Sequence, residues 1–156
     1  MQTLTPEVRQ ETAIPEVMRA HAPPFDYFDV FTITATAGAD TSPERWARVA
    51  VEDVAGAAGQ FVWRGILRLR LADRPDRVGG WKIADRGNRW LRLEAQSRVL
   101  TAHVVVHVGD ERLTVGTFVR YDRPIARLVW PRLAVVHRAA MPRLLRGTVR
   151  MMSRSR

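Results

Sequence analysis

The chain has 156 residues, with 25 basic and 16 acidic side chains, a net charge of +9, 46% hydrophobic residues and no cysteine. A chain of this length forms one domain and buries roughly 68–70% of its unfolded surface without covalent cross-links. The absence of cysteine excludes disulfides, thiolate metal sites and cysteine nucleophiles. No apolar run reaches the roughly 18 to 20 residues of a membrane span, and residues 1–17 lack a signal-peptide pattern, so we expect a soluble cytoplasmic protein.

The first part of the chain carries the weakest structural signal. Residues 1–24 contain four prolines and no sustained hydrophobic period, which predicts a partly ordered arm that wraps or frays. We therefore expect a single folded domain over residues 25–156. The aromatic and β-branched run at 27–37 predicts its first strand, which the turn residues 38–40 end.

The next segment has the signals of a helix and of its two ends. Thr41 and Glu44 have the spacing of a capping box, and Pro43 suits the first turn, where a missing N–H costs little. Gly56 and Gly59 are expected to end this helix.

Residues 60–71 fit two interpretations. Leucine alternates with arginine at 67–71, which suits a strand, whereas Trp63, Ile66 and Arg70 recur at helical spacing. We favour the helix. Alternating runs joined by short polar links follow, and they predict an antiparallel meander. Its expected strands are 80–86, 89–97, 99–108 and 112–121.

The last segment predicts a long amphipathic helix. Pro124 and Pro131 lead into this helix, which continues to about Met152, and Pro142 is expected to kink or briefly break it. A meander whose strands each carry one apolar face must cover that face, and the helix is the available cover. We therefore expect an α+β domain in which a curved sheet grips the helix and leaves a cavity between the two.

All of the excess positive charge lies near the C-terminus. Residues 112–156 hold 11 arginines and one acid, whereas residues 1–111 are nearly neutral. On a helical wheel four arginines fall within about 60° of one another, beside a mainly apolar stripe. This basic face comprises Arg132, Arg143, Arg146 and Arg150, and the stripe comprises Leu133, Ala140, Leu144, Thr148 and Met151. The face is either a solvated surface or a contact for anionic lipid or an acidic protein. Nucleic acid is disfavoured, because exposed aromatics and Gly-rich basic loops do not accompany these arginines.

Five segments, taken in order, carry a family resemblance: DYFDVF at 26–31, SPERWA at 42–47, GWKIADRGNRWLRLEAQ at 80–96, LTVGTFVRY at 113–121 and IARLVWPRLAVVHRAAMPRLLR at 125–146. They resemble a bacterial family of unknown function related to the START and polyketide-cyclase superfamily, which has the helix-grip fold. The resemblance covers residues 25–150. It matches the family's acidic residue to Asp29, a second-strand aromatic to Trp81, its T-x-V to Thr117 and Val119, and its final-helix histidine to His137.

Members of that superfamily bind lipids, sterols, polyketides or plant hormones in the cavity under the last helix. Some of them cyclise or dehydrate the bound molecule without a metal or an organic cofactor. The resemblance therefore implies a hydrophobic small molecule as the partner and no cofactor.

The candidate site residues are His137, Thr117, Tyr121 and Trp81. His137 falls about 140° from the first arginine of the basic face, within the apolar stripe. It is therefore either a core histidine bonded to a backbone carbonyl or a ligand contact and general acid or base. Thr117 and Tyr121 share the apolar face of the last strand, where each hydroxyl needs a backbone or ligand partner. Trp81 is either a core residue or part of a cavity wall.

Two further histidines and one acid lie on the predicted strands. His103 and His107 would be about 13 Å apart on an extended strand, so one metal ion could not bridge them and we expect no metal site. The alternating valines of this strand form the better inward face, so both histidines are expected at the surface. Glu94 shares its face with Arg92, which indicates a cross-strand ion pair.

These observations favour a protein that binds a mainly apolar small molecule in the cavity, with Thr117, Tyr121 or His137 orienting it. The first alternative is a cofactor-free cyclase or dehydratase, in which His137 moves a proton and Tyr121 donates a hydrogen bond to a carbonyl. The second alternative is an interaction module that uses the basic face. We expect a monomer or a homodimer.

Overall fold

The computed structural model of the chain describes residues 6–35 and 41–154. Its strands are β1 (Val8–Glu11), β2 (Tyr27–Thr34), β3 (Arg77–Val78), β4 (Trp81–Arg86), β5 (Trp90–Gln96), β6 (Leu100–Val108) and β7 (Arg112–Tyr121). Its helices are α1 (Glu16–Arg19), α2 (Pro43–Arg48), α3 (Gly56–Gln60) and α4 (Ala126–Arg154), with wide π-type turns at η1 (Val49–Ala55) and η2 (Phe61–Ile66).

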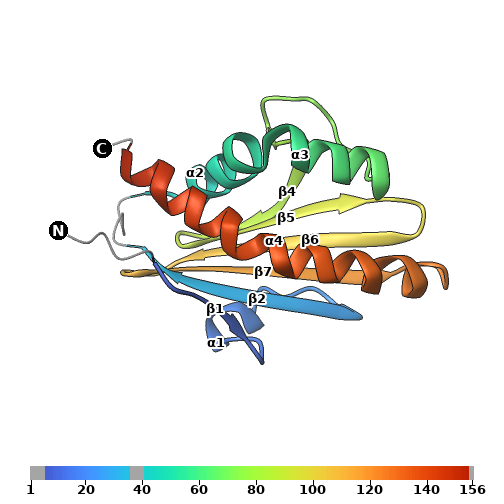
Figure 1. Ribbon diagram of the computed structural model, residues 1–156, viewed down its shortest axis with the longest axis horizontal. Coiled ribbons are helices and arrows are strands. Elements are labelled where there is room, and N and C mark those ends of the chain that lie inside the picture. Colours follow the sequence, from blue (N-terminus) through green and yellow to red (C-terminus); the bar gives the residue numbers. More distant parts are fainter. Residues whose placement is uncertain (1–5, 36–40, 155–156) are drawn as a thin grey trace.

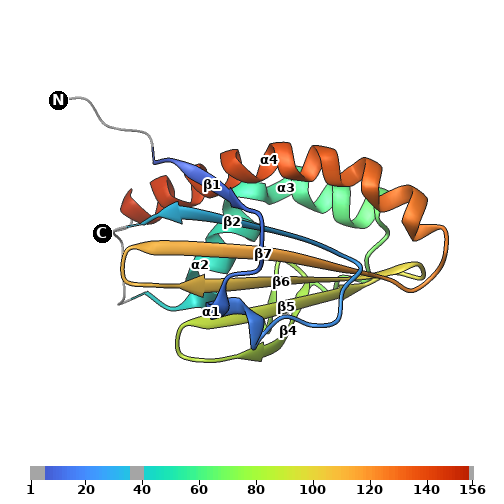
Figure 2. The same cartoon turned by 90° about the horizontal axis from the view of Figure 1, so that it is seen from below.

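The strands of the described residues form one seven-stranded antiparallel sheet with the order β1-β2-β7-β6-β5-β4-β3. Helix α4 and the segment from α2 to η2 run along the same side of this sheet (Figure 1), and Figure 2 shows α4 and α3 above the strands. The predicted α+β class, the curved antiparallel sheet and the long C-terminal helix are therefore confirmed.

The strand boundaries follow the sequence pattern closely. The four predicted strands of the meander are confirmed to within one residue at each end, and the first predicted strand begins at Tyr27 as expected. That strand ends at Thr34, three residues before the predicted end at 37, and Ala35 already lies outside it. The turn predicted at 38–40 lies outside the described residues. The sequence pattern did not predict β1, β3 or α1.

The inner face of the sheet, under the helices, carries the main hydrophobic core. Ala102 and Val106 of β6 and Val119 of β7 lie in it. Because successive side chains of a strand point to opposite faces, the inward sets predicted for β6 and β7 are confirmed. Trp46 of α2 and Leu145 of α4 enter the same core from above and are at most 1% exposed.

The outer face of the sheet has a smaller core of its own. Four side chains with no exposed surface form it: Met18, Val30, Val105 and Phe118. Met18 comes from α1, so the segment before Phe25 wraps across the outer face, and β1 adds an edge strand beside β2. Gly116 permits this close approach, because a Cβ at that position would lie 3.0 Å from the Met18 sulfur.

The helical segment begins one residue later than the capping-box spacing predicts. Ser42 is the N-cap: its backbone is extended, and its Oγ accepts a hydrogen bond from the Arg45 N–H at 3.2 Å. Pro43 is the first helical residue, as expected. The residue before a proline avoids the helical conformation, so Ser42 cannot be helical and takes the cap position that Thr41 was expected to have.

Gly56 and Gly59 do not end the helix, contrary to expectation. Gly56 has a left-handed φ of +49°, yet helical turns resume at once and continue to Ile66, where η2 ends. The wide turns of η1 accommodate the irregularity while they pack against α4. The helix favoured for residues 60–71 is thus confirmed as far as residue 66 and is wrong beyond it, where Arg68 takes a φ of +55°.

Helix α4 runs without a break from Ala126 to Arg154 and includes both Pro131 and Pro142. The break expected at Pro142 is therefore absent. Met141 and Leu145, on either side of it, are buried in the core, and this packing offsets the hydrogen bond that proline removes.

The buried face of α4 is rotated roughly 70° from the predicted stripe. Ala140 and Met151, which the helical wheel assigned to the stripe, are exposed. Trp130, Met141 and Leu145 take core positions instead, and each removes a large apolar surface from water. The buried face comprises Ala126, Trp130, Ala134, Met141, Leu145, Thr148, Val149 and Met152.

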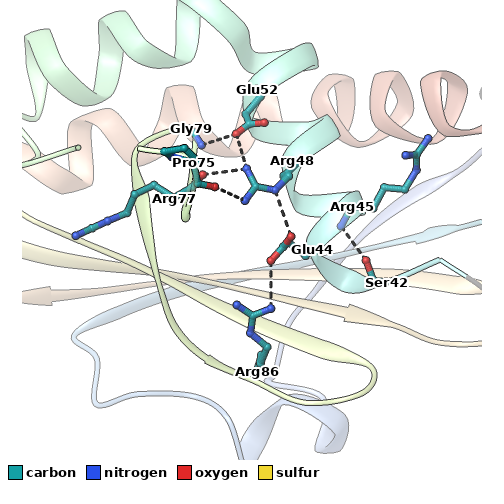
Figure 3. Close-up of polar contacts among 9 residues, drawn as sticks. All are labelled: Ser42, Glu44, Arg45, Arg48, Glu52, Pro75, Arg77, Gly79 and Arg86. Atoms are coloured by element: carbon teal, nitrogen blue, oxygen red, sulfur yellow. Dashed lines mark hydrogen bonds and ion pairs between the residues drawn. The ribbon is translucent and has the colours of Figure 1, made fainter. Parts of the chain in front are cut away.

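One arginine ties the helical segment to the loop beside β3. The Arg48 guanidinium donates to the carbonyl oxygens of Pro75, in that loop, and of Arg77, in β3, and it pairs with two carboxylates of its own helical segment (Figure 3). Glu52, one of these acids, also accepts a hydrogen bond from the Gly79 N–H at 3.0 Å. The partners of Arg48 are Glu44, Glu52, Pro75 and Arg77. These contacts hold α2 and η1 beside β3 and β4.

The packing of α4 on the sheet gives a direct test. Replacement of Leu145 by alanine (Leu145→Ala) deletes a side chain with no exposed surface and leaves a cavity between α4 and the strands. We expect the free energy of unfolding to fall by about 2–5 kcal/mol, measured by urea denaturation.

Leu128→Ala is the matched control, because Leu128 lies on the same helix and is 63% exposed. We expect the control to change the free energy of unfolding by no more than about 0.5 kcal/mol. Equal losses for the two variants would contradict the packing of α4 described above.

Candidate functional site

Asp29 is the only buried carboxylate among the described residues, with 1% of its surface exposed. The alternation of β2 places Asp29 on the inner face with Tyr27, and in the sheet register it lies opposite Thr117 of β7. An ionised carboxylate is costly to bury unless neighbouring groups compensate its charge. The neighbours of Asp29 therefore define a candidate site.

Two side chains approach the same oxygen of Asp29. The Tyr27 hydroxyl donates a hydrogen bond to Oδ2 at 2.6 Å, and His137 Nε2 of α4 lies 3.1 Å from that oxygen. The histidine contact lacks the angles of a hydrogen bond, so it stabilises the carboxylate by charge when the imidazole is protonated. The second oxygen, Oδ1, is buried and has no donor among the residues the structure describes.

Two further residues of α4 complete the group. Arg138 donates a hydrogen bond to the Tyr27 hydroxyl oxygen at 3.2 Å, and its guanidinium lies 6.0 Å from the centroid of the Tyr27 ring. The Trp130 ring centroid lies 5.4 Å from that of Tyr27 and 5.7 Å from that of His137. We call these five residues, Tyr27, Asp29, Trp130, His137 and Arg138, the Asp29 cluster.

The electrostatics of the cluster keep the phenol protonated. Burial, and then the neighbouring Asp29 carboxylate, raise the pKa of Tyr27 well above its ordinary value, while Arg138 acts in the opposite direction. Tyr27 is therefore a hydrogen-bond donor at neutral pH. The His137 side chain is 24% exposed, so part of its surface is open to solvent.

The arrangement supports two kinds of chemistry. A carboxylate, an imidazole and a phenol can together fix the orientation of a ligand's polar group. A carboxylate beside an imidazole can also hold the ring in position while the imidazole transfers protons.

The four candidate residues from the sequence do not all meet. His137 contacts Asp29, and Thr117 lies opposite Asp29 in the register of β2 and β7. Tyr121 lies on the same face of β7, two residues beyond the partner of Tyr27, and its backbone N–H donates to Asp26. Trp81 is in β4, four strands away from β2, which is roughly 19 Å at the spacing of neighbouring strands. It packs edge-on against Trp63 in the core.

Sequence reasoning from the residues themselves missed four members of the cluster. Tyr27, Trp130 and Arg138 were not proposed, and Asp29 was singled out by the family resemblance alone. One signal was present: Tyr27 and Asp29 alternate on one face of a predicted strand, which places an acid among inward residues. On α4, Trp130 and His137 are seven residues apart, about two turns along one side.

The histidines of β6 point to the outer face, as predicted, but only one of them keeps a surface position. His107 is partly exposed, whereas His103 is 6% exposed because α1 contacts β6 at this face. Glu94 lies opposite His103, with its carboxylate 3.9 Å from Nε2. Burial lowers the pKa of His103, so this cross-strand pair is not an ion pair at neutral pH. The predicted cross-strand ion pair of Glu94 is therefore not found among the described residues. Arg92, which shares a face of β5 with Glu94, donates from its guanidinium to the His21 carbonyl oxygen.

Two open hollows stand out on the surface of the described residues, and neither is the cavity expected between the sheet and α4. One, of about 850 Å³, is bordered by β1, α1 and the β6–β7 turn, and the other, of about 630 Å³, lies between α3 and the loop before β4. Neither is lined by a residue of α4 or by any of the four candidate residues. The inner face of the sheet is occupied by the core side chains.

A comparison of the chain with protein-family models, with curated proteins and with solved structures finds no match. The resemblance to the START and polyketide-cyclase superfamily therefore stays a prediction. Among the described helices, none combines the length and the apolar character that a bilayer span requires.

The pKa of Tyr27 can be measured because the chain has only two tyrosines. In Tyr121→Phe, we expect the remaining phenol to ionise well above its ordinary value near 10, as followed by ultraviolet absorbance of the phenolate. The free energy of unfolding should fall as the pH rises above 10, because the unfolded chain then loses a proton that the folded chain keeps.

Asp29→Asn in the same background removes the negative charge beside the phenol, so we expect the pKa of Tyr27 to move down toward its ordinary value. Asp85→Asn, at an exposed carboxylate of β4, is the control and should leave that pKa unchanged. An ordinary pKa for Tyr27, or no response to Asp29→Asn, would show that the hydroxyl is not bonded to Asp29 in solution.

Proposed function

We propose that the protein binds a mainly apolar small molecule where β2 meets α4, and that the Asp29 cluster orients the polar group of this molecule. The observation that carries the proposal is the buried Oδ1 of Asp29, which has no hydrogen-bond donor among the described residues. Buried polar atoms are almost always paired in folded proteins, so an unpaired carboxylate oxygen favours a donor supplied from outside the chain.

A second polar atom points to the same place. The Trp130 indole N–H is also buried without an acceptor, and its ring lies beside both Tyr27 and His137. A ligand with a hydroxyl group matches this pair, since a hydroxyl donates one hydrogen bond and accepts others. The proposed ligand therefore carries a hydroxyl or a comparable group that both donates and accepts.

The body of the ligand is proposed to be apolar. Tyr27, Tyr121 and Leu133 are partly buried and pack against the main core, so they offer apolar surface next to the cluster. Removal of such surface from water stabilises a complex by about 2.5 kcal/mol for each 100 Å² before ordering costs. Because core side chains occupy the inner face, the ligand enters past the partly exposed His137 as that side chain turns aside.

One observation favours a second candidate, a cofactor-free cyclase or dehydratase. The Asp29 carboxylate lies 3.1 Å from His137 Nε2, close enough for a hydrogen bond once the imidazole turns toward it. An acid bonded in this way orients an imidazole for proton transfer. In this candidate the imidazole moves a proton of the bound molecule, and the protonated Tyr27 stabilises the charge of Asp29.

Native mass spectrometry of the protein, purified from the cells that make it naturally, tests the proposal. We expect a retained small molecule in the wild type, and at least tenfold lower occupancy in Asp29→Asn, because an amide replaces the charged acceptor. Thr148→Val is the matched control: it removes a buried hydroxyl of α4 that bonds to its own helix at Leu144, and it should keep the ligand. Full occupancy in Asp29→Asn, or no retained molecule in the wild type, would contradict the proposal.

His137→Gln separates binding from turnover. A binding protein should retain the same molecule, with affinity changed only a few-fold. An enzyme should retain the unreacted molecule in the variant and the product in the wild type. The two retained molecules should then differ in mass if the reaction is a dehydration, or in their fragmentation pattern if it is a cyclisation. Identical molecules in both would exclude the enzymatic candidate.

A further inference from the structure

The side of α4 that faces away from the sheet combines arginines with exposed aliphatic side chains. In Figures 1 and 2 this helix lies on the outside of the molecule, with the sheet on its other side. Seven residues of the outward side fall within about 100° on the helical wheel, and we call them the outer stripe. They are Leu128, Arg132, Val135, Val136, Arg143, Arg146 and Arg150.

The charge of the outer stripe is not balanced by the protein. Helix α4 has seven arginines and no acidic residue. No described carboxylate lies within ion-pair distance of Arg132, Arg143 or Arg150, and all three are exposed. Arginines elsewhere in the molecule differ: Arg48 and Arg120, for example, are paired with acids. Arg146 is the exception, since it is half-buried and donates a hydrogen bond to the Pro6 carbonyl oxygen at 3.3 Å. Arg132, Arg143 and Arg150 therefore present a positive surface that lacks an acidic partner within the described chain.

The apolar part of the stripe is equally unusual for a solvated helix face. Leu128, Val135 and Val136 are 63%, 59% and 65% exposed, respectively. They lie on both sides of Arg132 and within one or two turns of it. Aliphatic side chains next to unpaired arginines suit a surface that is anionic at its exterior and apolar just beneath, which is the character of a lipid headgroup region.

We propose that the outer stripe of α4 docks on an anionic lipid surface. The helix lies parallel to the membrane, its guanidinium groups bind headgroup phosphates, and the three aliphatic side chains enter the boundary between headgroups and acyl chains. With 29 residues, α4 offers a contact about 43 Å long. This proposal uses residues outside the Asp29 cluster and does not depend on the proposed function.

The composition of the stripe favours lipid over nucleic acid. Nucleic-acid surfaces combine phosphate contacts with aromatic side chains that stack on bases, and the outer stripe has no aromatic residue. A phosphate backbone also gains nothing from the exposed aliphatics, whereas a lipid surface does. An acidic protein partner is left as an outcome of the test.

Sedimentation with vesicles of phosphatidylcholine, with and without phosphatidylglycerol, tests the proposal on the whole protein. We expect binding only when phosphatidylglycerol is present, and we expect it to weaken as salt is raised. Arg132→Gln/Arg143→Gln/Arg150→Gln should lower the partition coefficient about 100-fold, since each basic residue near an anionic surface contributes about fivefold. Val135→Ser/Val136→Ser should lower it about tenfold, because two apolar side chains no longer leave water.

The matched control is Arg70→Gln/Arg98→Gln/Arg112→Gln, which removes the same charge from exposed positions outside α4. It should change the partition coefficient by no more than about threefold, the effect of net charge alone. Equal losses in the two arginine variants, or no binding to phosphatidylglycerol vesicles at low salt, would overturn the proposal. Competition gives a further test. If duplex DNA or polyglutamate releases the protein from the vesicles at lower concentrations than added phosphatidylglycerol vesicles do, and if the valine substitutions have no effect, the lipid proposal is overturned. The stripe is then assigned to nucleic acid or to an acidic protein.

Discussion

The fold depends on a sheet whose central strands are apolar on both faces. Residues 113–119 of β7 are all buried, and they alternate between two cores. Val119 points into the main core under the helices, and Phe118 points into the smaller core on the outer face. Such strands are stable only if both faces are removed from water. The requirement explains why the chain needs α4 and α2 on one side and α1 on the other.

The same requirement gives Asp29 its significance. The inner face of β2 is part of the main core, so a carboxylate on it loses its hydration almost completely. An apolar side chain of similar volume would serve the packing at least as well, since buried ion pairs seldom stabilise a fold over hydrophobic replacements. Only one oxygen of Asp29 is compensated by Tyr27 and His137. Asp29 is therefore the one buried acid, among the described residues, on an inner face that is otherwise mainly apolar, and such exceptions gather at functional sites.

The sequence predicted best what depends on local pattern. The strands from Trp81 to Tyr121 alternate regularly and are joined by short turns, so their positions and inward faces follow from period and turn chemistry alone. Strand β1 (VRQE) escaped prediction because it is an edge strand whose pairing with β2 relies on the backbone and needs no apolar pattern. Met18 escaped for a related reason: a single buried side chain in a four-residue helix gives no period to detect.

The site was predictable only in part, because its residues meet through tertiary packing and not through a local sequence pattern. His137 could be found because its place on the helical wheel is a local property, whereas its contact with Asp29 joins residues more than a hundred positions apart. Which residues meet there depends on where α4 crosses β2 and on how the helix is rotated about its own axis. A rotation of roughly 70° from the predicted stripe moves Arg138 onto Tyr27 and leaves His137 at the edge of the buried face, partly open to solvent.

Helix α4 has two faces with different physical origins. Its inner face is explained by the fold, because Leu145 and its buried neighbours cover the sheet. The fold does not explain its outer stripe. Arg146 and Arg150 are one helical turn apart, and like charges at that spacing destabilise a helix by about 0.2–0.5 kcal/mol. Exposed valines at 135 and 136 add no packing that would offset this repulsion. The docking proposed above gives this outer face a physical explanation, because an anionic surface converts the repulsion between these arginines into binding.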